Sequence, residues 1–297
     1  MSYILLARKP GDIQVVEATS ANSQVSELTK NQVLDWVSEY GAVLFRGFDT
    51  SIEAFSSLVK TVSTRVTLDP ARNHATDSAQ LVDAGTDKVG LHLENGNAPI
   101  LPHLAWFYCK KAAKHGSQTT YCDGNAVWPT LNKAAQNLFA GQRIKYARCL
   151  PEKLWKKYTH SELDGIKSPE DVTFSHLQIL GNKVDGQKFT LLESDDVYSE
   201  FSVWAVRKSL FSDTTGFSNS LLGPSFNYEK PMITMENDDP IPDAIWQHIE
   251  QQTDKQTRNI EWQDHDIVLL DNTRVMHGRR EIIDTDRELY NALSYVA

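Results

Sequence analysis

Residues 90–95 read Gly-Leu-His-Leu-Glu-Asn, which puts His92 and Glu94 two positions apart. Side chains at positions i and i+2 of a β-strand point to the same face, so we expect both residues to reach one metal ion. This spacing also occurs by chance in many chains, and a third ligand is needed to make the prediction specific. Residues 266–280 supply it, as an apolar strand, a turn at 271–272, and then His277 followed by Gly-Arg-Arg. Two histidines and one carboxylate that leave coordination positions open are the facial triad of non-haem Fe(II) oxygenases.

The composition narrows the class of protein. With 297 residues and 40% hydrophobic side chains, the chain can form one large domain or two small ones. The formal net charge of −9 argues against nucleic acid and anionic membranes as partners, because both attract basic surfaces. A carrier protein, usually acidic, stays open as a partner but is not favoured for the same reason. Cys109, Cys122 and Cys149 have neither a disulfide pattern nor the spacing of a zinc site, so we expect reduced thiols.

The sequence also predicts where the protein works. No apolar run approaches the roughly 18–20 residues that cross a bilayer. Residues 1–10 lack the basic segment that precedes the apolar run of a signal peptide. We therefore expect a soluble, cytoplasmic protein.

Local signals predict two helices ahead of the first metal motif. Thr29 and Gln32 have the form of a capping box, apolar residues follow at helical spacing, and Gly41 is placed to end the helix. A buried strand at 42–45 and a second helix at 51–64 come next, and residues 66–90 are expected to be loop. Further expected elements are strands within 1–20, 104–109 and 266–270, a turn at 123–125, and helices from Pro129 to Phe139 and over 241–250.

Three blocks of sequence, in this order, resemble one enzyme family. They are His-Leu-Glu at 92–94, Trp-Phe-Tyr-Cys at 106–109 continuing to Gly-Ser-Gln-Thr-Thr at 116–120, and Asp-Asn-Thr-Arg-Val-Met-His-Gly-Arg at 271–279. The run Gly-Ala-Val-Leu-Phe-Arg-Gly-Phe at 41–48 also resembles the N-terminal strand of that family. The combination is similar to the Fe(II)/2-oxoglutarate-dependent dioxygenase superfamily, in the branch of taurine dioxygenase and clavaminate synthase.

The resemblance implies a mixed α/β, mainly β fold, with a double-stranded β-helix (jelly roll, cupin-like) as the core, flanking helices and a lid insertion. It implies a single catalytic domain over 1–297. In that domain 1–65 would support the core, 90–150 and 222–297 would form the jelly roll, and 150–222 would form the lid. The implied cofactors are Fe(II), held by His92, Glu94 and His277, with 2-oxoglutarate as cosubstrate and O2.

A second set of residues is expected to bind 2-oxoglutarate. Residues 112–120 resemble the family signature Pro-Ala-x-x-Gly-Gly-x-Thr, with Ser117 in place of the second glycine. The resemblance implies that Thr119 donates a hydrogen bond to a carboxylate of 2-oxoglutarate. It also implies that Arg287 binds the far carboxylate, a task that suits the planar guanidinium fork. Arg279 is the reserve candidate.

Four residues are candidates for substrate contact. Asn95 directly follows the carboxylate ligand, Asp195 and Asp196 belong to an acidic run in the lid, and Asn227 lies where the chain returns to the core. The acidic run could meet a cationic amine or guanidinium, or it could be a solvated loop.

The resemblance implies that a small, amino-acid-like metabolite of a biosynthetic pathway is hydroxylated, desaturated or epoxidised, with release of succinate and CO2. Related halogenases have a small residue where this chain has Glu94, so halogenation is not favoured. Two other classes stay open on the residues: a zinc hydrolase with the same three ligands, and a non-catalytic barrel that binds a small acid. A zinc hydrolase would have no use for the carboxylate-binding residues Thr119 and Arg287. A protein that only binds a small acid would need no metal ligands.

Overall fold

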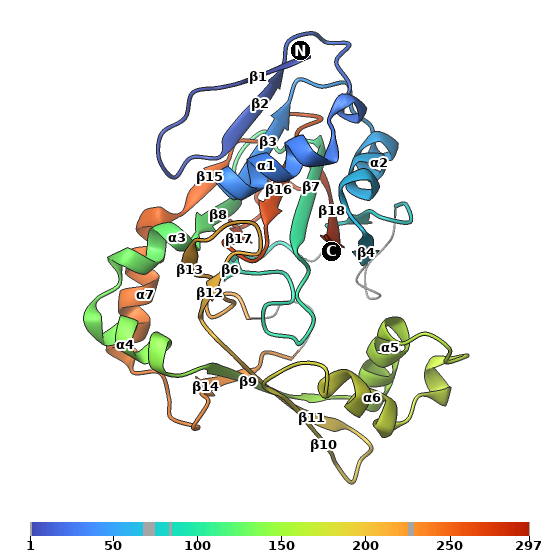
Figure 1. The fold of residues 1–297 in the computed structure, drawn as a ribbon, viewed down its shortest axis with the longest axis vertical. Helices are drawn as coiled ribbons and strands as arrows, with labels where there is room; N and C mark the ends of the chain where they lie inside the picture. The colour runs from blue at the N-terminus through green and yellow to red at the C-terminus, as the bar shows by residue number, and fades with distance from the viewer. Residues whose placement is uncertain (1, 68–74, 83–84, 225–228, 297) are drawn as a thin grey trace.

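Two β-sheets that face each other form the centre of the molecule (Figure 1). The computed structural model describes residues 2–67, 75–82, 85–224 and 229–296. The larger sheet has the strand order β1-β2-β3-β16-β7-β18-β4, with β5 also paired to β18, and the smaller sheet has the order β15-β8-β17-β6. The bounds in the larger sheet are β1 Tyr3–Leu5, β2 Gln14–Ala18, β3 Ala42–Arg46, β4 Arg65–Thr67, β5 Gln80–Leu81, β7 Leu104–Lys111, β16 Ile267–Asp271 and β18 Glu288–Tyr295. Those in the smaller sheet are β6 Val89–His92, β8 Thr119–Asp123, β15 Arg258–Ile260 and β17 Val275–Arg279.

The chain alternates between the two sheets. Strands β6, β7 and β8 belong in turn to the smaller, the larger and the smaller sheet, and β15 to β18 alternate in the same way. The facing surfaces are apolar: Leu44, Phe107 and Val268 of the larger sheet share one buried cluster with Tyr121 and Val275 of the smaller sheet. The expectation of a mixed α/β, mainly β fold is confirmed.

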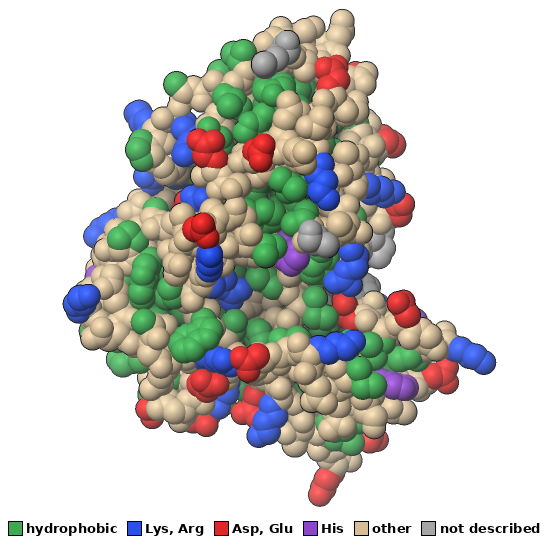
Figure 2. Space-filling view, viewed as in Figure 1, with side chains coloured by type: hydrophobic (Ala, Val, Ile, Leu, Met, Phe, Trp, Pro, Cys, Tyr) green, Lys and Arg blue, Asp and Glu red, His purple; other side chains and the backbone are tan. Residues whose placement is uncertain are grey.

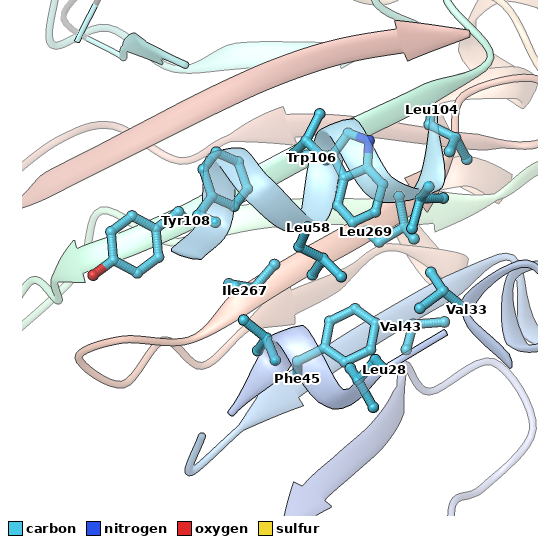
Figure 3. Packing of buried hydrophobic residues seen from close by; sticks show 14 of the residues in the cluster. Leu28, Val33, Val43, Phe45, Leu58, Leu104, Trp106, Tyr108, Ile267 and Leu269 are labelled. Carbon is cyan, nitrogen blue, oxygen red and sulfur yellow. The ribbon is translucent and has the colours of Figure 1, made fainter. Parts of the chain in front are cut away.

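Helices α1 (Lys30–Tyr40) and α2 (Ile52–Val62) cover the other face of the larger sheet, after the short 3-10 helix η1 (Val25–Glu27). The start and end of α1 are confirmed, because Thr29 Oγ1 accepts from the Gln32 amide and Gly41 follows the helix with φ 74°. The N-cap of α2 is Ser51, as expected. Figure 3 shows the apolar side chains between helices and sheet, which include Leu28, Val33, Val43, Phe45, Leu58, Leu104, Trp106, Tyr108, Ile267 and Leu269.

Four helices lie against the outside of the smaller sheet: α3 (Gly124–Val127), η2 (Trp128–Thr130), α4 (Lys133–Gly141) and α7 (Asp243–Gln256). The turn predicted at 123–125 is wrong, since Asp123 accepts from the Asn125 amide and caps α3. The helix expected from Pro129 begins later, after its N-cap Asn132. Helix α7 is confirmed and extends six residues beyond the expected end at 250.

A third sheet, in the order β10-β11-β9-β14, carries a separate lobe with α5 and α6. Figure 1 shows this lobe set apart from the two facing sheets, and Figure 2 shows a notch between them. Strands β12 and β13 form a hairpin that leads back toward the smaller sheet. The bounds are β9 Ile144–Leu150, β10 Gln187–Leu191, β11 Val197–Val203, β12 Val206–Lys208, β13 Thr215–Phe217, β14 Met232–Met235, α5 Glu152–Glu162, η3 Pro169–Asp171 and α6 Phe174–Gly181.

The segment expected to be a loop at 66–90 contains strands. Strands β4 and β5 pair with β18, and β6 begins at Val89. The prediction is wrong there because these strands are short and polar, and their stability comes from the edge of a sheet formed by distant residues.

The three cysteines are free thiols, as predicted. Among the residues that the structure describes, no helix is both long and apolar enough to span a bilayer.

Gly90 permits a close backbone contact beside the first metal motif. A Cβ atom there would lie 1.8 Å from the carbonyl oxygen of Leu222, so the segment after β13 packs directly on β6. A side chain at this position has no room, since its neighbour is backbone rather than a flexible side chain.

We predict that Gly90→Ala lowers the free energy of unfolding by about 1–3 kcal/mol, the usual cost of overpacking. Urea unfolding measures the effect. Gly141→Ala is the matched control, because a Cβ there meets nothing within 4 Å. Equal stability of the two variants would contradict the close packing of these segments.

Candidate metal centre

The antiparallel pairing of β6 with β17 puts His92 and His277 opposite each other. Their ring centroids are 4.4 Å apart. Glu94 lies in the turn that follows β6, and a metal-ligating atom from each of the three residues lies within 4.8 Å of the others. The expectation that His92 and Glu94 share one strand face is therefore wrong, because β6 ends at His92. The two side chains meet because the turn folds Glu94 back.

The donor set fits a divalent metal ion. Nδ1 of His92 is hydrogen-bonded to the Gly90 carbonyl at 2.9 Å, so this ring nitrogen is the protonated one and Nε2 remains the donor for a metal. Nε2 of His277 lies 3.3 Å from Oε1 of Glu94. Two ligands at about 2.0–2.2 Å from one metal, at right angles to each other, are roughly 3 Å apart, which is close to this distance. The side chains of His277 and Glu94 are only 5% and 15% exposed, so the site is shielded from water.

Asn272 fixes the backbone of Glu94. Its Oδ1 accepts from the Glu94 amide at 2.8 Å, and its Nδ2 donates to the carbonyls of Glu94 at 3.0 Å and Pro102 at 2.8 Å. Asn272 is fully buried and lies five residues before His277, in the turn between β16 and β17. One amide thus connects the segment that carries the carboxylate to the segment that carries the second histidine. The sequence analysis interpreted Asn272 only as a turn residue and missed this role.

We predict that Asn272→Asp weakens metal binding by about 10- to 100-fold, the range seen when a group that orients a ligand is lost. The variant keeps the acceptor for the Glu94 amide but replaces the donor with an oxygen that faces two carbonyls. Calorimetric titration with Mn(II) measures the affinity. Exposed Asn237→Asp serves as the control, and equal affinity of both variants with the wild type would show that Asn272 has no positioning role.

Thr119, Arg279 and Arg287 lie together at one end of the smaller sheet, and these three residues are named the cationic pocket. Thr119 begins β8 and lies opposite Arg279 at the end of β17, two residues beyond His277. Arg287 Nη1 donates to the carbonyl of Ser117 at 3.0 Å. Burial, and after it the charge of Arg279, lowers the pKa of Arg287 to about 10, so the group stays charged at neutral pH. Two guanidinium groups that repel each other in a half-buried pocket favour an anion between them.

The hydroxyl of Thr119 already accepts a hydrogen bond from Trp262 Nε1 at 3.0 Å. Its own proton can therefore be donated to an anion in the pocket. Arg279 is 8% exposed, and its Nη2 donates to the carbonyl of Asp87 at 2.7 Å.

Ser117, the departure from the glycine of the family signature, builds this pocket. It is buried, has φ 61°, and its Oγ accepts from the amides of Ile283 and Asp284 at 3.0 and 3.1 Å. Its carbonyl holds Arg287, so one residue connects the start of β8 to the segment that delivers the arginine. The sequence analysis identified Ser117 only as a departure from the family signature, whereas its hydroxyl makes contacts that glycine could not.

We predict that Ser117→Gly raises the KM for 2-oxoglutarate about fivefold, the effect of losing roughly 1 kcal/mol of hydrogen bonding. Glycine keeps the positive φ without strain, so the change isolates the hydroxyl. Succinate release at varied 2-oxoglutarate concentration measures the KM. An unchanged KM would show that the hydroxyl does not position Arg287.

The candidate substrate residues have different locations. Asn95 follows Glu94 in the turn, is exposed and has φ 56°, a conformation that asparagine tolerates well. Asp195 and Asp196 lie in the turn between β10 and β11, where Asp196 accepts from the Glu152 amide and caps α5. The carbonyl of Asp195 accepts from Trp155 Nε1. The Asp196 carboxylate thus has a local structural partner, and substrate contact by Asp195 and Asp196 stays a prediction. Asn227 lies outside the described residues.

Asn291 is a polar residue that the sequence analysis did not select. It is 1% exposed and lies opposite Phe107 in the pairing of β18 with β7. The Phe107 ring meets the His277 ring edge-on at 5.1 Å between centroids. Paired residues of antiparallel strands point to the same face, so Asn291 also faces the interior beside the metal centre. In the described part of the chain, its Oδ1 has no hydrogen-bond partner.

Comparison with known proteins identifies the family. The model of the family described as "Taurine catabolism dioxygenase TauD, TfdA family" matches residues 9–293. The dapdiamide synthesis protein DdaC of Enterobacter agglomerans is 24% identical over 295 residues, covering 90% of this chain and 87% of that protein.

Solved structures show the same fold. PvcB of Pseudomonas aeruginosa, described as an Fe, alpha-ketoglutarate dependent oxygenase from an isonitrile synthetic pathway, gives a TM-score of 0.64 at 12% identity, over 100% of this chain and 93% of that one. AAD-2, solved in complex with Mn(II) and N-oxalylglycine, gives a TM-score of 0.63 at 13% identity, over 100% and 98%. The chain belongs to the TauD/TfdA family, and it is a dioxygenase that depends on Fe(II), 2-oxoglutarate and O2.

Proposed function

We propose that His92, Glu94 and His277 hold the Fe(II) ion and that the neighbouring pocket holds 2-oxoglutarate. The observation that carries this assignment is the distance along β17: His277 and Arg279 are two residues apart on one strand, so the metal site and the cationic pocket are adjacent. In this arrangement Arg287 binds the far carboxylate of 2-oxoglutarate in bidentate fashion, Thr119 donates to it, and Arg279 adds positive charge.

The residues of the chain then have distinct tasks. Iron and 2-oxoglutarate, when bound, supply the activation of O2 and the oxidising power, with release of succinate and CO2. Glu94 and the two histidines would hold the ion and would leave coordination positions open for cosubstrate and oxygen. Asn272 keeps Glu94 in place, and Phe107 and the apolar residues between the sheets exclude water from the reacting groups.

We also propose that the two facing sheets are the double-stranded β-helix of this family. The alternation of β6, β7 and β8, and of β15 to β18, between the sheets supports that topology. In this interpretation residues 1–297 form one catalytic domain, since β1, β2 and β3 extend the larger sheet through the pairing of β3 with β16. Residues 150–222 then form the lid, and β9 and β14 anchor it.

For the substrate we propose a small, amino-acid-like metabolite of a biosynthetic pathway. The name of DdaC, which assigns that relative to dapdiamide synthesis, supports a biosynthetic role. Asn95, beside Glu94, is the proposed contact from the metal motif. Because Glu94 occupies a coordination position that a halide would need, the expected outcomes are hydroxylation, desaturation or epoxidation.

Anaerobic addition of Fe(II) and 2-oxoglutarate to the metal-free protein tests the assignment. We predict a weak visible charge-transfer band, which is absent in His277→Ala because a ligand is gone. The band should need a higher 2-oxoglutarate concentration in Arg287→Ala, because the far carboxylate has lost its main partner. Arg280→Ala, at an exposed position beside the pocket, is the control for Arg287.

A protein that holds zinc tightly and develops no such band would contradict the iron assignment. It would favour the zinc hydrolase, for which the cationic pocket beside His277 has no purpose. A band that survives His277→Ala would show that another residue holds the metal.

A further inference from the structure

Arg207, on β12, is a half-buried cation that the proposed chemistry does not use. Its Nε and Nη2 atoms are buried, and within the described residues neither has a hydrogen-bond partner. Two other inward arginines of this chain have carboxylate partners. Arg46 donates from Nε and Nη2 to Asp266, and Arg274 donates in the same way to Asp123. Arg207 thus differs from Arg46 and Arg274, and also from Arg279 and Arg287, which donate to backbone carbonyls.

The hairpin that carries Arg207 is attached to the segment before His277. Ser209, directly after β12, donates from Oγ to Asp271 at 2.6 Å, and the Leu210 amide donates to Thr273 at 2.9 Å. Burial raises the pKa of Asp271, and the hydrogen bonds from Ser209 and Thr273 act against this. The hairpin therefore has a fixed position relative to β17.

The same hairpin is attached to the segment of the other two ligands. The Ser218 amide, after β13, donates to the carbonyl of Ala205, and Ser220 Oγ bonds to both the amide and the carbonyl of Leu93. Leu93 lies between His92 and Glu94. The hydroxyl of Tyr146, on β9, accepts a hydrogen bond from the Ser220 amide. Arg207 is near enough to Tyr146 for the two side chains to interact electrostatically. The hairpin that carries Arg207 is thus attached to both segments that carry the proposed metal ligands.

The surroundings of Arg207 supply no compensating negative charge in the described part of the chain. Burial lowers the pKa of Arg207, which means that its environment disfavours the cation. Burial raises the pKa of Tyr146, so that phenol is neutral and is not a counter-ion. A guanidinium group nevertheless stays charged in proteins, and an uncompensated buried charge is costly to the fold. An anion that arrives with the substrate would remove this cost.

We infer that Arg207 binds a carboxylate of the substrate and so selects an anionic substrate and orients it over the metal. This inference rests on the proposed function, because it assumes that the substrate lies between the metal centre and the hairpin of β12 and β13. A planar carboxylate is the group that a guanidinium fork with two unused donors matches best.

Arg207→Met tests the inference through the sign of its effect on stability. Methionine fills similar volume without charge. If Arg207 is an uncompensated charge until an anion binds, its removal stabilises the ligand-free protein. The melting temperature of the ligand-free variant is then about 2–4 °C higher than that of the wild type. Arg46→Met, which leaves Asp266 without its partner, is the control and should melt lower. A variant Arg207→Met that melts lower than the wild type would overturn the inference, since Arg207 would then stabilise the fold itself.

Binding of simple anions supplies the second measurement. The protein is loaded with Mn(II) and N-oxalylglycine to fill the pocket of Arg287, and acetate and methylphosphonate are titrated at constant ionic strength. We expect acetate to raise the melting temperature of the wild type, and its affinity to fall about tenfold or more in Arg207→Met. An absent acetate effect in the wild type, equal affinity in the variant, or a preference for methylphosphonate would each overturn the carboxylate assignment.

The visible band of the Fe(II)/2-oxoglutarate complex separates this inference from the proposed function. A wild type without the band would overturn the proposed function. A wild type with the band, together with a failed acetate test, would overturn the role of Arg207 alone.

Discussion

The pairing of β6 with β17 is the constraint on which the site depends. It places His92 opposite His277, although 185 positions separate them in the chain. Strand pairing fixes only two of the three proposed ligands, because Glu94 lies beyond the end of β6. Asn272 provides the missing restraint with three hydrogen bonds to backbone atoms, two of them to Glu94. A metal ligand on irregular backbone has a fixed position only if hydrogen bonds hold that backbone. Here these hydrogen bonds come from Asn272, in the turn that leads into β17.

The inward arginines differ in their hydrogen-bond partners. Inward arginines with a structural role are paired with carboxylates, as Arg46 is with Asp266 and Arg274 with Asp123. Arg287 instead donates to a carbonyl, and Nε and Nη2 of Arg207 have no partner in the described residues. Buried cations without carboxylate partners reduce the stability of the free enzyme, and anionic ligands restore it. We therefore expect the binding sites for 2-oxoglutarate and for substrate to contain arginines without carboxylate partners, whose positive charge an anionic ligand neutralises.

The sequence predicted those parts of the site that have local signals. The apolar run before Asp271 and the histidine after it predicted β16, the turn and β17. The capping box at Thr29 predicted α1 in the same way. Glu94 was selected correctly as part of the cluster for the wrong reason, since no local signal shows that β6 ends at His92. The role of Asn272 could not be predicted, because its partner Glu94 is 178 positions away and turn residues of this kind are common. Ser117 and Arg207 act through backbone conformation and burial, which only the folded chain reveals.

The most direct test of the account is the position of the metal in crystals grown anaerobically with Fe(II), measured by anomalous diffraction at the iron edge. We expect one strong peak, at about 2.0–2.2 Å from Nε2 of His92, a carboxylate oxygen of Glu94 and a ring nitrogen of His277. No protein ligand should lie on the side of the metal that faces Arg287. A peak that lacks Glu94 among its ligands, or that lies away from β6 and β17, would contradict this expectation.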